Sequence, residues 1–427
     1  MGNVPRLRFL GFSGEWEWKT FDKVYSLKVT NSFSRDKLNY EKGLVKNIHY
    51  GDIHTKFFTL FDIKKEVVPY INPLQSIENI KPENYCVEGD IIFADASEDL
   101  NDIGKNIEII NLNNEKLLSG LHTLLARLKK ADLIIGFGGY LFKSNIIRNQ
   151  IKKESQGTKV LGLSGKRLSA INIYFPKTKK EQQKIANCLS SIDQVITVQT
   201  QKLDSLKAHK KGLMQQLFPA EGESIPKLRF PEFWDAGDWE KAKLGDKEVS
   251  EFIKDRVPLN QLDINSYIST KNLLPDYAGI KVAIKLPPSG SFTQFKKKDI
   301  LISNIRPYLK KVWQAQMNGS SSNDVIVIRA KNRIINNFLM YLLKNDYFIS
   351  YVMRDAKGVK MPRGDISSIK KYPVFYPEKP EQQKIASCLS SLDNLITTQT
   401  QKIETLKAHK KGLMQQLFPS NNVSTNQ

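Results

Sequence analysis

The sequence predicts an α+β fold in which two globular domains are separated by a pair of long antiparallel coiled-coil helices, arranged as a pseudo-two-fold internal repeat. Two observations predict this architecture. Residues 181–219 recur at residues 381–419, with 31 of the 39 positions identical. The blocks that precede the two copies, residues 10–175 and 231–375, hardly resemble each other beyond their short shared beginnings. The chain therefore alternates two divergent blocks with two nearly identical segments.

The periodicity of the repeated segment predicts a helix. Its seam residues recur at alternating intervals of three and four, the heptad pattern of a coiled coil. At 1.5 Å per residue, a helix of about 37 residues is a rod of about 55 Å. Each rod has one apolar stripe and needs a partner, and the nearest candidate is the other copy in the chain. The apolar seam residues are Leu189, Ile192, Ile196, Leu203, Leu206, Leu213 and Leu217 in the first copy, and Leu389, Leu392, Ile396, Ile403, Leu406, Leu413 and Leu417 in the second.

Two such rods can pair in either direction. Antiparallel pairing would relate the halves by a pseudo-two-fold axis and put the divergent blocks at opposite ends of a rigid spacer. Gln199 and Lys210, with their copies Gln399 and Lys410, interrupt the seam. Such polar positions fix the register of a coiled coil at some cost in stability.

Local signals place the ends of the helices. Thr178-Lys-Lys-Glu181 reads as a capping box, and Pro380 suits the first turn of the second helix. A Phe-Pro pair ends each copy. The predicted boundaries are a first globular domain over residues 1–175, a helix over 176–219, a linker over 220–230, a second globular domain over 231–375, a second helix over 376–419, and a disordered tail over 420–427.

Strand-like apolar runs predict mixed helix and strand content in both divergent blocks. A basic glycine turn stands near the end of each block, Gly157-Thr-Lys159 in the first and Gly358-Val-Lys360 in the second. Such a turn suits a phosphate contact or serves simply as a turn. The strand-like runs are Asp90–Phe93, Ile107–Ile110, Leu133–Phe137, Ile173–Phe175, Asp299–Ile302, Val325–Ile328 and Pro373–Phe375.

The charge indicates a polyanionic partner. The chain has 65 Lys and Arg against 44 Asp and Glu, a net charge of +21. No apolar run approaches the roughly 18–20 residues of a membrane span, and the N-terminus lacks the apolar core of a signal peptide. We therefore expect a cytoplasmic protein with no membrane association. Three cysteines exclude a disulfide scaffold and disfavour a cysteine-ligated zinc site.

Signatures of catalysis are missing from the sequence. Asn72-Pro-Leu-Gln75 departs from the loop that holds a target adenine in methyltransferases, and Gly136-Phe-Gly-Gly139 is too short a glycine cluster to indicate a cofactor loop. Asp90, Asp95, Glu98 and Asp99 form an acidic cluster, but no lysine motif accompanies it to make a nuclease centre. We expect a binding protein with no catalytic residue and no metal site.

Several motifs resemble one family. They are the opening Pro5-Arg-Leu-Arg-Phe9 with Trp16-Glu17, echoed by Pro226-Lys-Leu-Arg-Phe230 with Trp239-Glu240; the segment Glu-Gln-Gln-Lys-Ile-Ala, present twice; and the helix ending Leu-Lys-Ala-His-Lys-Lys-Gly-Leu-Met-Gln-Gln-Leu-Phe. The arrangement resembles the specificity subunit of type I restriction-modification systems, HsdS, over essentially the whole chain.

The resemblance implies a function. Each globular domain would be a target-recognition domain that binds one half of a bipartite site in double-stranded DNA. The paired helices would set the spacing and dock methyltransferase subunits, two per chain, and a restriction subunit would complete the assembly. The chain itself would be non-catalytic and without cofactor, whereas S-adenosylmethionine, ATP and Mg²⁺ would belong to the partner subunits.

Base-reading residues do not follow from the resemblance, because target-recognition domains diverge. Loop chemistry favours side chains that reach base edges or phosphates. Arg306 is the most attractive for a bidentate guanine contact, with a strand-end ion pair as the alternative. The predicted DNA-binding residues are His49, Tyr50, Ser97 and Lys159 in the first domain, and Lys271, Asn304, Arg306, Tyr308, Lys360 and Arg363 in the second.

Two other functions stay open on the sequence alone. The first is a coiled-coil scaffold for protein partners, whose basic charge is incidental. The second is a nuclease or methyltransferase that acts without other subunits.

Overall fold

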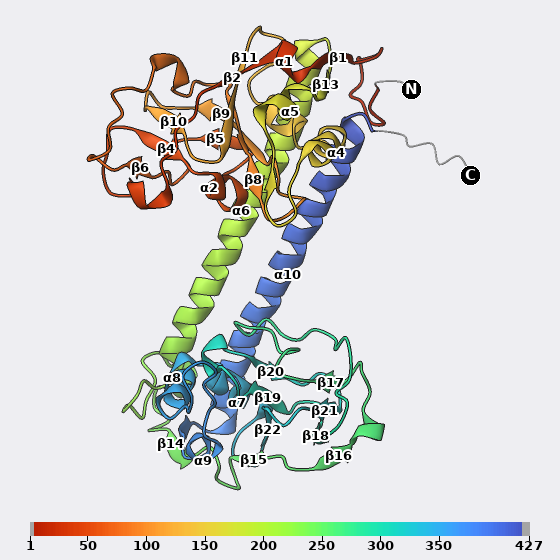
Figure 1. The fold of residues 1–427 in the computed structure, drawn as a ribbon. Helices are drawn as coiled ribbons and strands as arrows, with labels where there is room; N and C mark the ends of the chain where they lie inside the picture. Colours follow the sequence, from red (N-terminus) through yellow and green to blue (C-terminus); the bar gives the residue numbers. More distant parts are fainter. Residues whose placement is uncertain (1–3, 421–427) are drawn as a thin grey trace. The chain divides into compact units, whose positions relative to one another are not determined.

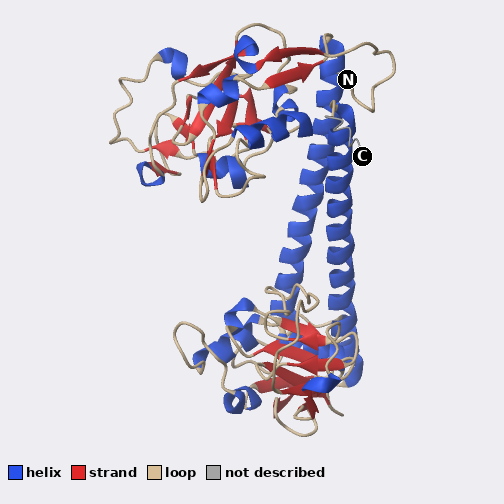
Figure 2. Ribbon diagram, turned by 45° about the vertical axis from the view of Figure 1, so that its right-hand side comes forward, coloured by secondary structure: helices blue, strands red, loops and turns tan. Residues whose placement is uncertain are grey.

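The computed structural model describes residues 4–420, and its internal contacts divide the chain into two units. Unit 1 comprises Met1–Thr200 with Lys402–Gln427, and unit 2 comprises Gln201–Gln401. The two repeated segments form uninterrupted helices, α6 (Lys179–Leu217) and α10 (Lys379–Leu417), as Figures 1 and 2 show. Each unit therefore contains part of both helices. The predicted tail over 420–427 lies, apart from Ser420, outside the described residues.

Unit 1 is built on a five-stranded sheet of order β2-β11-β7-β9-β5, joined by a four-stranded sheet of order β10-β4-β6-β3. Two short antiparallel pairs, β1 with β13 and β8 with β12, complete its strands. The strands are β1 Glu17–Thr20, β2 Tyr25–Lys28, β3 Leu38–Asn39, β4 Lys46–Ile48, β5 Leu60–Asp62, β6 Tyr70–Ile71, β7 Ile91–Ala94, β8 Ala96–Ser97, β9 Asn106–Asn111, β10 Leu117–Ser119, β11 Thr123–Leu128, β12 Leu161–Gly162 and β13 Asn172–Phe175. The short helices are α1 Phe21–Val24, α2 Tyr50–Thr55, α3 Gly138–Leu141, α4 Asn145–Glu154 and α5 Gly165–Ser169.

Unit 2 has the same kinds of element in a smaller set. One four-stranded sheet has the order β15-β22-β19-β20, a second has the order β16-β18-β21-β17, and β14 pairs with β23. The strands are β14 Glu240–Lys243, β15 Ser250–Phe252, β16 Arg256–Pro258, β17 Tyr267–Ile268, β18 Ser291–Phe295, β19 Ile300–Ser303, β20 Val312–Gln314, β21 Gly319–Ser321, β22 Val325–Ala330 and β23 Pro373–Tyr376. The helices of its globular part are α7 Asn336–Leu343, α8 Asp346–Arg354 and α9 Ile366–Lys370.

The two long helices run antiparallel within each unit. In unit 1, Leu189 near the start of α6 shares a buried core with Leu417 and Phe418 at the end of α10. In unit 2, Leu389 near the start of α10 shares a core with the end of α6. Because the beginning of one helix lies against the end of the other, the antiparallel arrangement of the predicted fold is confirmed, a direction that the heptads alone left open.

None of the fourteen predicted seam residues is exposed. The buried positions extend past the seam, because each long helix also packs on a globular core. Ile185 and Ile385, one turn before the predicted seam, are 2% and 1% exposed. The fully buried seam residues are Leu189, Leu203, Leu217, Leu389, Ile403 and Leu417, and the other eight are half-buried.

A polar junction joins the helices to the globular part of unit 1. Asp193 of α6 accepts hydrogen bonds from the Lys410 ammonium of α10, at 2.5 and 2.7 Å, and from the Tyr140 hydroxyl, at 2.9 Å. The ammonium also lies 5.4 Å from the centre of the Tyr140 ring. The lysine that interrupts the predicted seam therefore has a carboxylate partner on the opposite helix.

The same junction recurs in unit 2. Asp393 accepts from the Lys210 ammonium at 2.6 Å and from the Tyr341 hydroxyl at 2.7 Å. Lys210 lies 5.4 Å from the centre of the Tyr341 ring. Each unit thus ties both helices and the globular part to one carboxylate.

The glutamate at the start of each repeat holds the segment that opens the globular part of its unit. Glu181 binds the Arg8 guanidinium through both oxygens, at 2.7 and 2.8 Å, and accepts from Trp16 Nε1 at 3.3 Å. Glu381 binds Arg229 in the same bidentate way, at 2.7 Å for each bond. The predicted capping box is therefore wrong, because the Glu181 carboxylate is occupied by this buried pair.

The next residue of the repeat also anchors the globular part. The Gln182 amide accepts from the Ile134 backbone N–H at 2.9 Å and donates to the Asp132 and Pro176 carbonyls. Gln382 makes the equivalent bonds to Ile335 N–H and to two carbonyls of unit 2. Both glutamines are fully buried, so the shared motif joins each helix to its globular part.

One predicted strand is wrong. The apolar run Leu133–Phe137 forms turns that lead into α3, whereas the other predicted runs lie largely on strands. The buried Glu108 carboxylate accepts from Gly136 N–H at 2.8 Å and from Gly139 N–H at 2.7 Å. Gly136 has φ +94°, outside the extended region. These side-chain acceptors satisfy backbone groups that a strand would pair with a neighbouring strand.

The contrast between buried and exposed ion pairs gives a first prediction. In the Arg229–Glu381 pair the side chains are 9% and 2% exposed, so Glu381→Gln leaves a buried guanidinium without its counter-charge. We expect a loss of about 3 kcal/mol in the free energy of unfolding, measured by urea denaturation. Glu232→Gln, in the exposed Glu232–Lys384 pair of the same unit, is the matched control and should leave stability unchanged. Equal effects of the two variants would contradict the role of the buried pair.

Glu108 gives a pH-dependent prediction. Burial raises the pKa of Glu108 from 4.5 to about 7, against the lowering effect of the Gly139 and Gly136 N–H groups. A raised pKa means that the folded protein holds a proton that the unfolded chain releases, so stability is lost as pH rises from about 4.5 through about 7. Urea denaturation at pH 5 and pH 8 should show the wild type losing about 2.5 kcal/mol relative to Glu108→Gln across this range. A constant difference between the two proteins would contradict the shift.

Candidate functional site

The candidate site of each unit begins directly after a central strand of its main sheet. Strand β7 is followed by Asp95 and strand β19 by Asn304. The Asp95 carbonyl accepts from Leu163 N–H at 2.8 Å, and the Asn304 carbonyl accepts from Gly364 N–H at 3.1 Å. The two positions are therefore structurally equivalent, although they belong to blocks that do not resemble each other.

A short glycine loop lies beside this position in both units. In unit 1, Gln156 and Gly162 exchange backbone hydrogen bonds at 3.0 and 2.7 Å. In unit 2, Lys357 and Arg363 exchange two such bonds at 2.9 Å each. The exchange closes each loop at the same length, so Lys159 and Lys360 occupy equivalent exposed places in the two loops.

The glycine of the first loop cannot be replaced freely. Gly157 has φ +127°, and a Cβ there would lie 2.0 Å from the Val160 carbonyl oxygen. Gly358 has φ +93° at the matching place. The predicted glycine turns are thus real turns, and each presents a lysine to solvent.

Strand pairing brings a second pair of predicted residues into register. Ser97 on β8 pairs with Leu161 on β12. In unit 2, Arg306 N–H donates to the carbonyl of Pro362, the residue equivalent to Leu161, at 2.8 Å. Ser97 and Arg306 therefore hold the same position, one carrying a hydroxyl and the other a guanidinium.

Arg306 is held in an unusual conformation. Its φ of 52° and ψ of 61° are left-handed, a region that non-glycine residues rarely adopt and that concentrates at functional sites. Among the described residues no carboxylate forms an ion pair with it, and its buried Nε has no hydrogen-bond partner. The alternative interpretation was that Arg306 forms an ion pair at the end of a strand, and no such pair is found among the described residues. Tyr308, two residues on, is 48% exposed.

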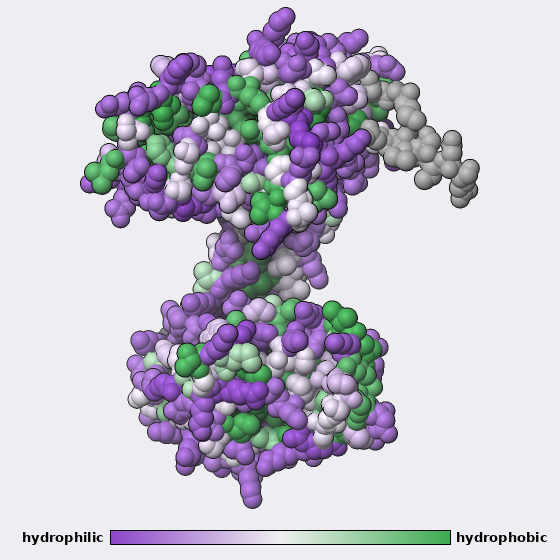
Figure 3. Space-filling model, in the orientation of Figure 1, coloured by the Kyte–Doolittle hydropathy of each residue, from purple (hydrophilic) through white to green (hydrophobic). Residues whose placement is uncertain are grey.

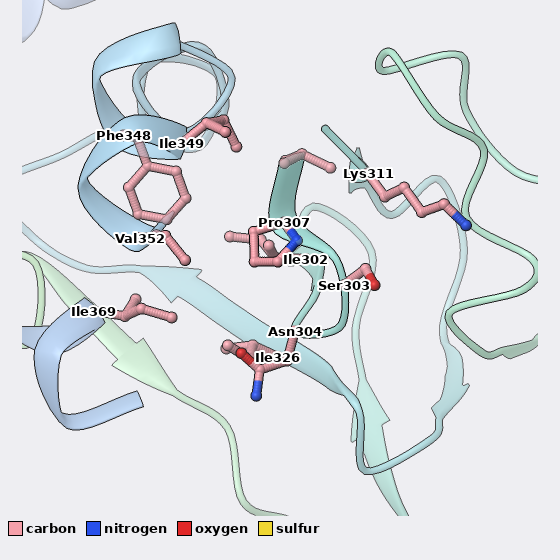
Figure 4. Close-up of a pocket in the computed structure, with 11 residues that line it drawn as sticks. Ile302, Ser303, Asn304, Pro307, Lys311, Ile326, Phe348, Ile349, Val352 and Ile369 are labelled. Atoms are coloured by element: carbon pink, nitrogen blue, oxygen red, sulfur yellow. The ribbon is translucent and has the colours of Figure 1, made fainter. Parts of the chain in front are cut away.

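Asn304 lies at the edge of an apolar cluster formed by β19, α8 and α9 (Figure 4). Phe348, Ile349 and Val352 of α8 face Ile302 and Ile326 in this view, while the Lys311 side chain extends away from them. Among the described residues, Asn304 Oδ1 has no hydrogen-bond partner. The apolar cluster thus supports a loop whose backbone groups are bonded within the unit, whereas the Asn304 side-chain oxygen is not.

The other predicted residues of unit 2 lie around this loop. Arg363 forms an ion pair with Asp324 at 2.8 Å, so its guanidinium is partly committed. Lys271 is exposed, and the carbonyl of its neighbour Thr270 accepts from Lys311 Nζ at 2.8 Å. The six predicted residues of unit 2 therefore belong to three neighbouring loops.

His49 has a structural role. Its Nδ1 accepts from Gly51 N–H at 3.1 Å and caps α2, and it lies 3.2 Å from Arg35 Nη2. Burial, with the Arg35 charge as a further cause, lowers the pKa of His49. The imidazole therefore has contacts within unit 1, and its predicted contact with DNA stays a prediction. Tyr50 stacks on it, with ring centres 4.7 Å apart.

Tyr50 contacts His122, a residue that was not among those predicted to bind DNA. Its ring lies 5.3 Å from that of His122, edge to face. His122 has a left-handed φ of 55° and is half exposed, and its Nδ1 lies 3.3 Å from Asp95 Oδ1. The aromatic and imidazole rings of α2 and of the β10–β11 loop thus gather beside Asp95.

A hollow of about 430 Å³ lies at this place in unit 1. Sequence reasoning missed most of its lining, since it is assembled from loops far apart in the chain. The hollow has both hydrogen-bonding groups and an apolar wall, which is the chemistry that base edges require. Its lining residues are Asp95, Ala96, His122, Gln156, Val160, Leu161, Gly162, Leu163, Ser164 and Arg167.

The acidic residues noted in the sequence do not assemble into a metal site. Asp90 is buried and paired with Arg127 at 2.7 Å, whereas Asp95 lies in the hollow. Within residues 4–420, no group of three or more histidine, cysteine or acidic residues is placed to hold a metal ion. In the glycine cluster at 136–139, the Gly136 and Gly139 N–H groups donate to the Glu108 carboxylate. These two groups are therefore not free to bind a cofactor phosphate.

The face of the molecule drawn in Figure 3 is mostly polar. Hydrophilic residues cover most of the face of each unit in Figure 3, with hydrophobic residues in small groups among them. Over the described part of the chain, no helix combines the length and apolar character that a bilayer span requires.

Comparisons with known proteins agree on one family. The family described as the type I restriction modification DNA specificity domain matches residues 39–208 and again residues 236–408. The type I restriction enzyme MjaVIII specificity subunit of Methanocaldococcus jannaschii is 26% identical over 344 residues, 74% of this chain and 76% of its own length.

Two solved structures share the fold. One is the S subunit of a type I restriction-modification system from M. genitalium, with a TM-score of 0.57 and 17% identity over 98% of this chain and 99% of its own. The other comes from a study of complex assembly and conformational transition of the type I R-M system, with a TM-score of 0.58 and 14% identity over 95% of this chain and 98% of its own.

Proposed function

Because this chain belongs to the family of type I restriction-modification specificity subunits, which are non-catalytic, we propose that each of its units reads one half of a bipartite site in double-stranded DNA. The loop cluster after β7 and the one after β19 are the reading surfaces. Their equivalence is the observation that carries the proposal.

Equivalent positions in the two clusters divide into two kinds. Lys159 and Lys360 are the same residue, whereas Ser97 and Arg306 differ. Phosphates are the same along any duplex, and base edges change with sequence. A shared lysine suits the phosphate contact, and the differing positions suit base readout. The net charge of +21 supplies the attraction to a polyanion.

We propose that the paired helices set the distance between the two half-sites. The Asp193–Lys410 and Asp393–Lys210 pairs allow one register of the helices, because each lysine meets its carboxylate only there. A helix of 39 residues is about 58 Å long, against about 34 Å for a turn of B-DNA. Such a length suits half-sites about one turn apart or slightly more.

The exposed surfaces of the repeated helices also favour the proposal that two methyltransferase subunits dock on the chain. Buried residues must match to pack, but exposed residues are under no such constraint. Lys184, Lys202, His209 and Lys211 are exposed and identical to their copies 200 residues on. A surface presented twice suits the same partner bound twice. A restriction subunit would join this assembly, and S-adenosylmethionine, ATP and Mg²⁺ would be bound by the partner subunits.

Binding to DNA tests the proposal against the protein scaffold. The chain, reconstituted with its methyltransferase subunits, should select one bipartite sequence from a pool of random duplexes. Its affinity should fall steeply with salt while the sequence preference persists. Binding of the subunits without any preferred sequence would support the scaffold. Turnover by the chain alone, with S-adenosylmethionine or Mg²⁺, would instead indicate a self-sufficient enzyme.

Arg306 provides a residue-level prediction. Its guanidinium has no ion pair to lose among the described residues, so Arg306→Ala should leave the melting temperature unchanged. A bidentate base contact is worth about 1–3 kcal/mol of discrimination. Competition binding should therefore show a loss of preference at one base pair of the half-site read by unit 2, and none in the other half. Arg354→Ala, which removes an exposed arginine paired with Glu221 of the same unit, is the matched control.

The spacing role predicts the effect of shortening both helices. Deleting residues 197–203 together with 397–403 removes one heptad from each helix and keeps both Asp–Lys pairs. The helix pair becomes about 10 Å shorter, the length of about three base pairs. Methylation mapping should show a spacer shortened by about three base pairs between unchanged half-sites. An altered half-site with the original spacer would contradict the spacing role.

A further inference from the structure

Asp95 has a fixed position and an unused hydrogen-bonding group. Its backbone N–H donates to the His122 carbonyl at 3.0 Å, and its carbonyl accepts from Leu163 N–H at 2.8 Å. These two bonds hold its Cβ at the wall of the hollow in unit 1. The side chain is 27% exposed although its Oδ1 is buried, so a group that enters the hollow can reach Oδ2.

Among the described residues, no group donates a hydrogen bond to the Asp95 carboxylate. His122 Nδ1 lies 3.3 Å from Oδ1, which is buried and accepts no hydrogen bond, whereas Oδ2 is not buried and also accepts none from residues 4–420. Desolvation by burial raises the pKa of Asp95, with His122 acting in the opposite direction. A half-buried acceptor without a donor is costly, and a ligand that supplies a donor removes that cost.

Basic groups surround the hollow. Arg167 lines it together with His122, and Lys159 stands on the adjoining glycine loop. A negative DNA backbone can therefore approach in spite of the carboxylate. The equivalent position of unit 2 is Asn304, whose Oδ1 is also buried and has no hydrogen-bond partner within residues 4–420. The same place thus carries an unused acceptor in both units, with a different side chain in each.

We infer that Asp95 is a specificity-determining residue that accepts a hydrogen bond from the exocyclic amino group of a cytosine or an adenine in the half-site read by unit 1. The inference rests on the proposed function. An ionised carboxylate only accepts hydrogen bonds, and the donors in the major groove are cytosine N4 and adenine N6. Guanine and thymine present acceptors at the same places, so Asp95 rejects them. Asn304 carries an amide in place of the carboxylate, and so imposes a different choice in unit 2.

Asp95→Asn tests the inference with an isosteric change. The probe is the duplex selected by the wild-type complex, varied one base pair at a time. We expect the wild type to prefer one amino-bearing base of the first half by 5- to 150-fold, and Asp95→Asn to lose that preference while keeping the second half. Glu98→Gln, an exposed acidic residue three positions on, is the matched control and should behave as the wild type.

A chemical substitution separates a contact from a structural effect. The preferred adenine is replaced by purine, or the preferred cytosine by 2-pyrimidinone, either of which lacks the amino group. The wild type should lose at least 5-fold in affinity, and Asp95→Asn less than 2-fold. An equal loss in both proteins, or a variant that keeps the wild-type preference throughout the first half, overturns the inference alone. A wild type without any sequence preference overturns the proposed function and the inference together.

Discussion

One carboxylate in each unit joins the two long helices to each other and to the globular part. Asp193 binds a lysine of the opposite helix and a tyrosine of the globular part, and Asp393 does the same in unit 2. A shift of either helix by one turn, about 5.4 Å, would separate these charges. The register of the helices and the seating of each globular part are therefore set by the same contact. A purely apolar seam would tolerate such a shift more easily.

The parts that repeat and the parts that differ have separate tasks. The repeated residues build the joints: Glu181 and Gln182 fasten α6 to the globular part of unit 1, and their copies fasten α10 to that of unit 2. The loops after β7 and β19 share a backbone pattern but not their side chains. A scaffold that holds variable loops on rigid elements is how many binding proteins change specificity without changing fold.

Sequence reasoning succeeded where the signal was local. The heptads placed both long helices, although they left the direction of pairing open, and most apolar runs became strands. It failed at Leu133–Phe137, since a buried carboxylate from another strand holds the glycines there in turns. It also took Glu181 for a cap, because it could not see the partner Arg8, and it did not foresee that His49 caps α2 through Gly51.

By itself, the sequence determined the duplication, the two rods with their seam, the basic charge and the family resemblance. The tertiary structure decided which loops meet, and so brought Asp95 to His122 and Arg306 to Pro362. The reason is physical. Helical periodicity acts between neighbours three or four residues apart, whereas sheet order and loop contacts join residues that are tens of positions apart. Only packing of the whole unit settles those pairings.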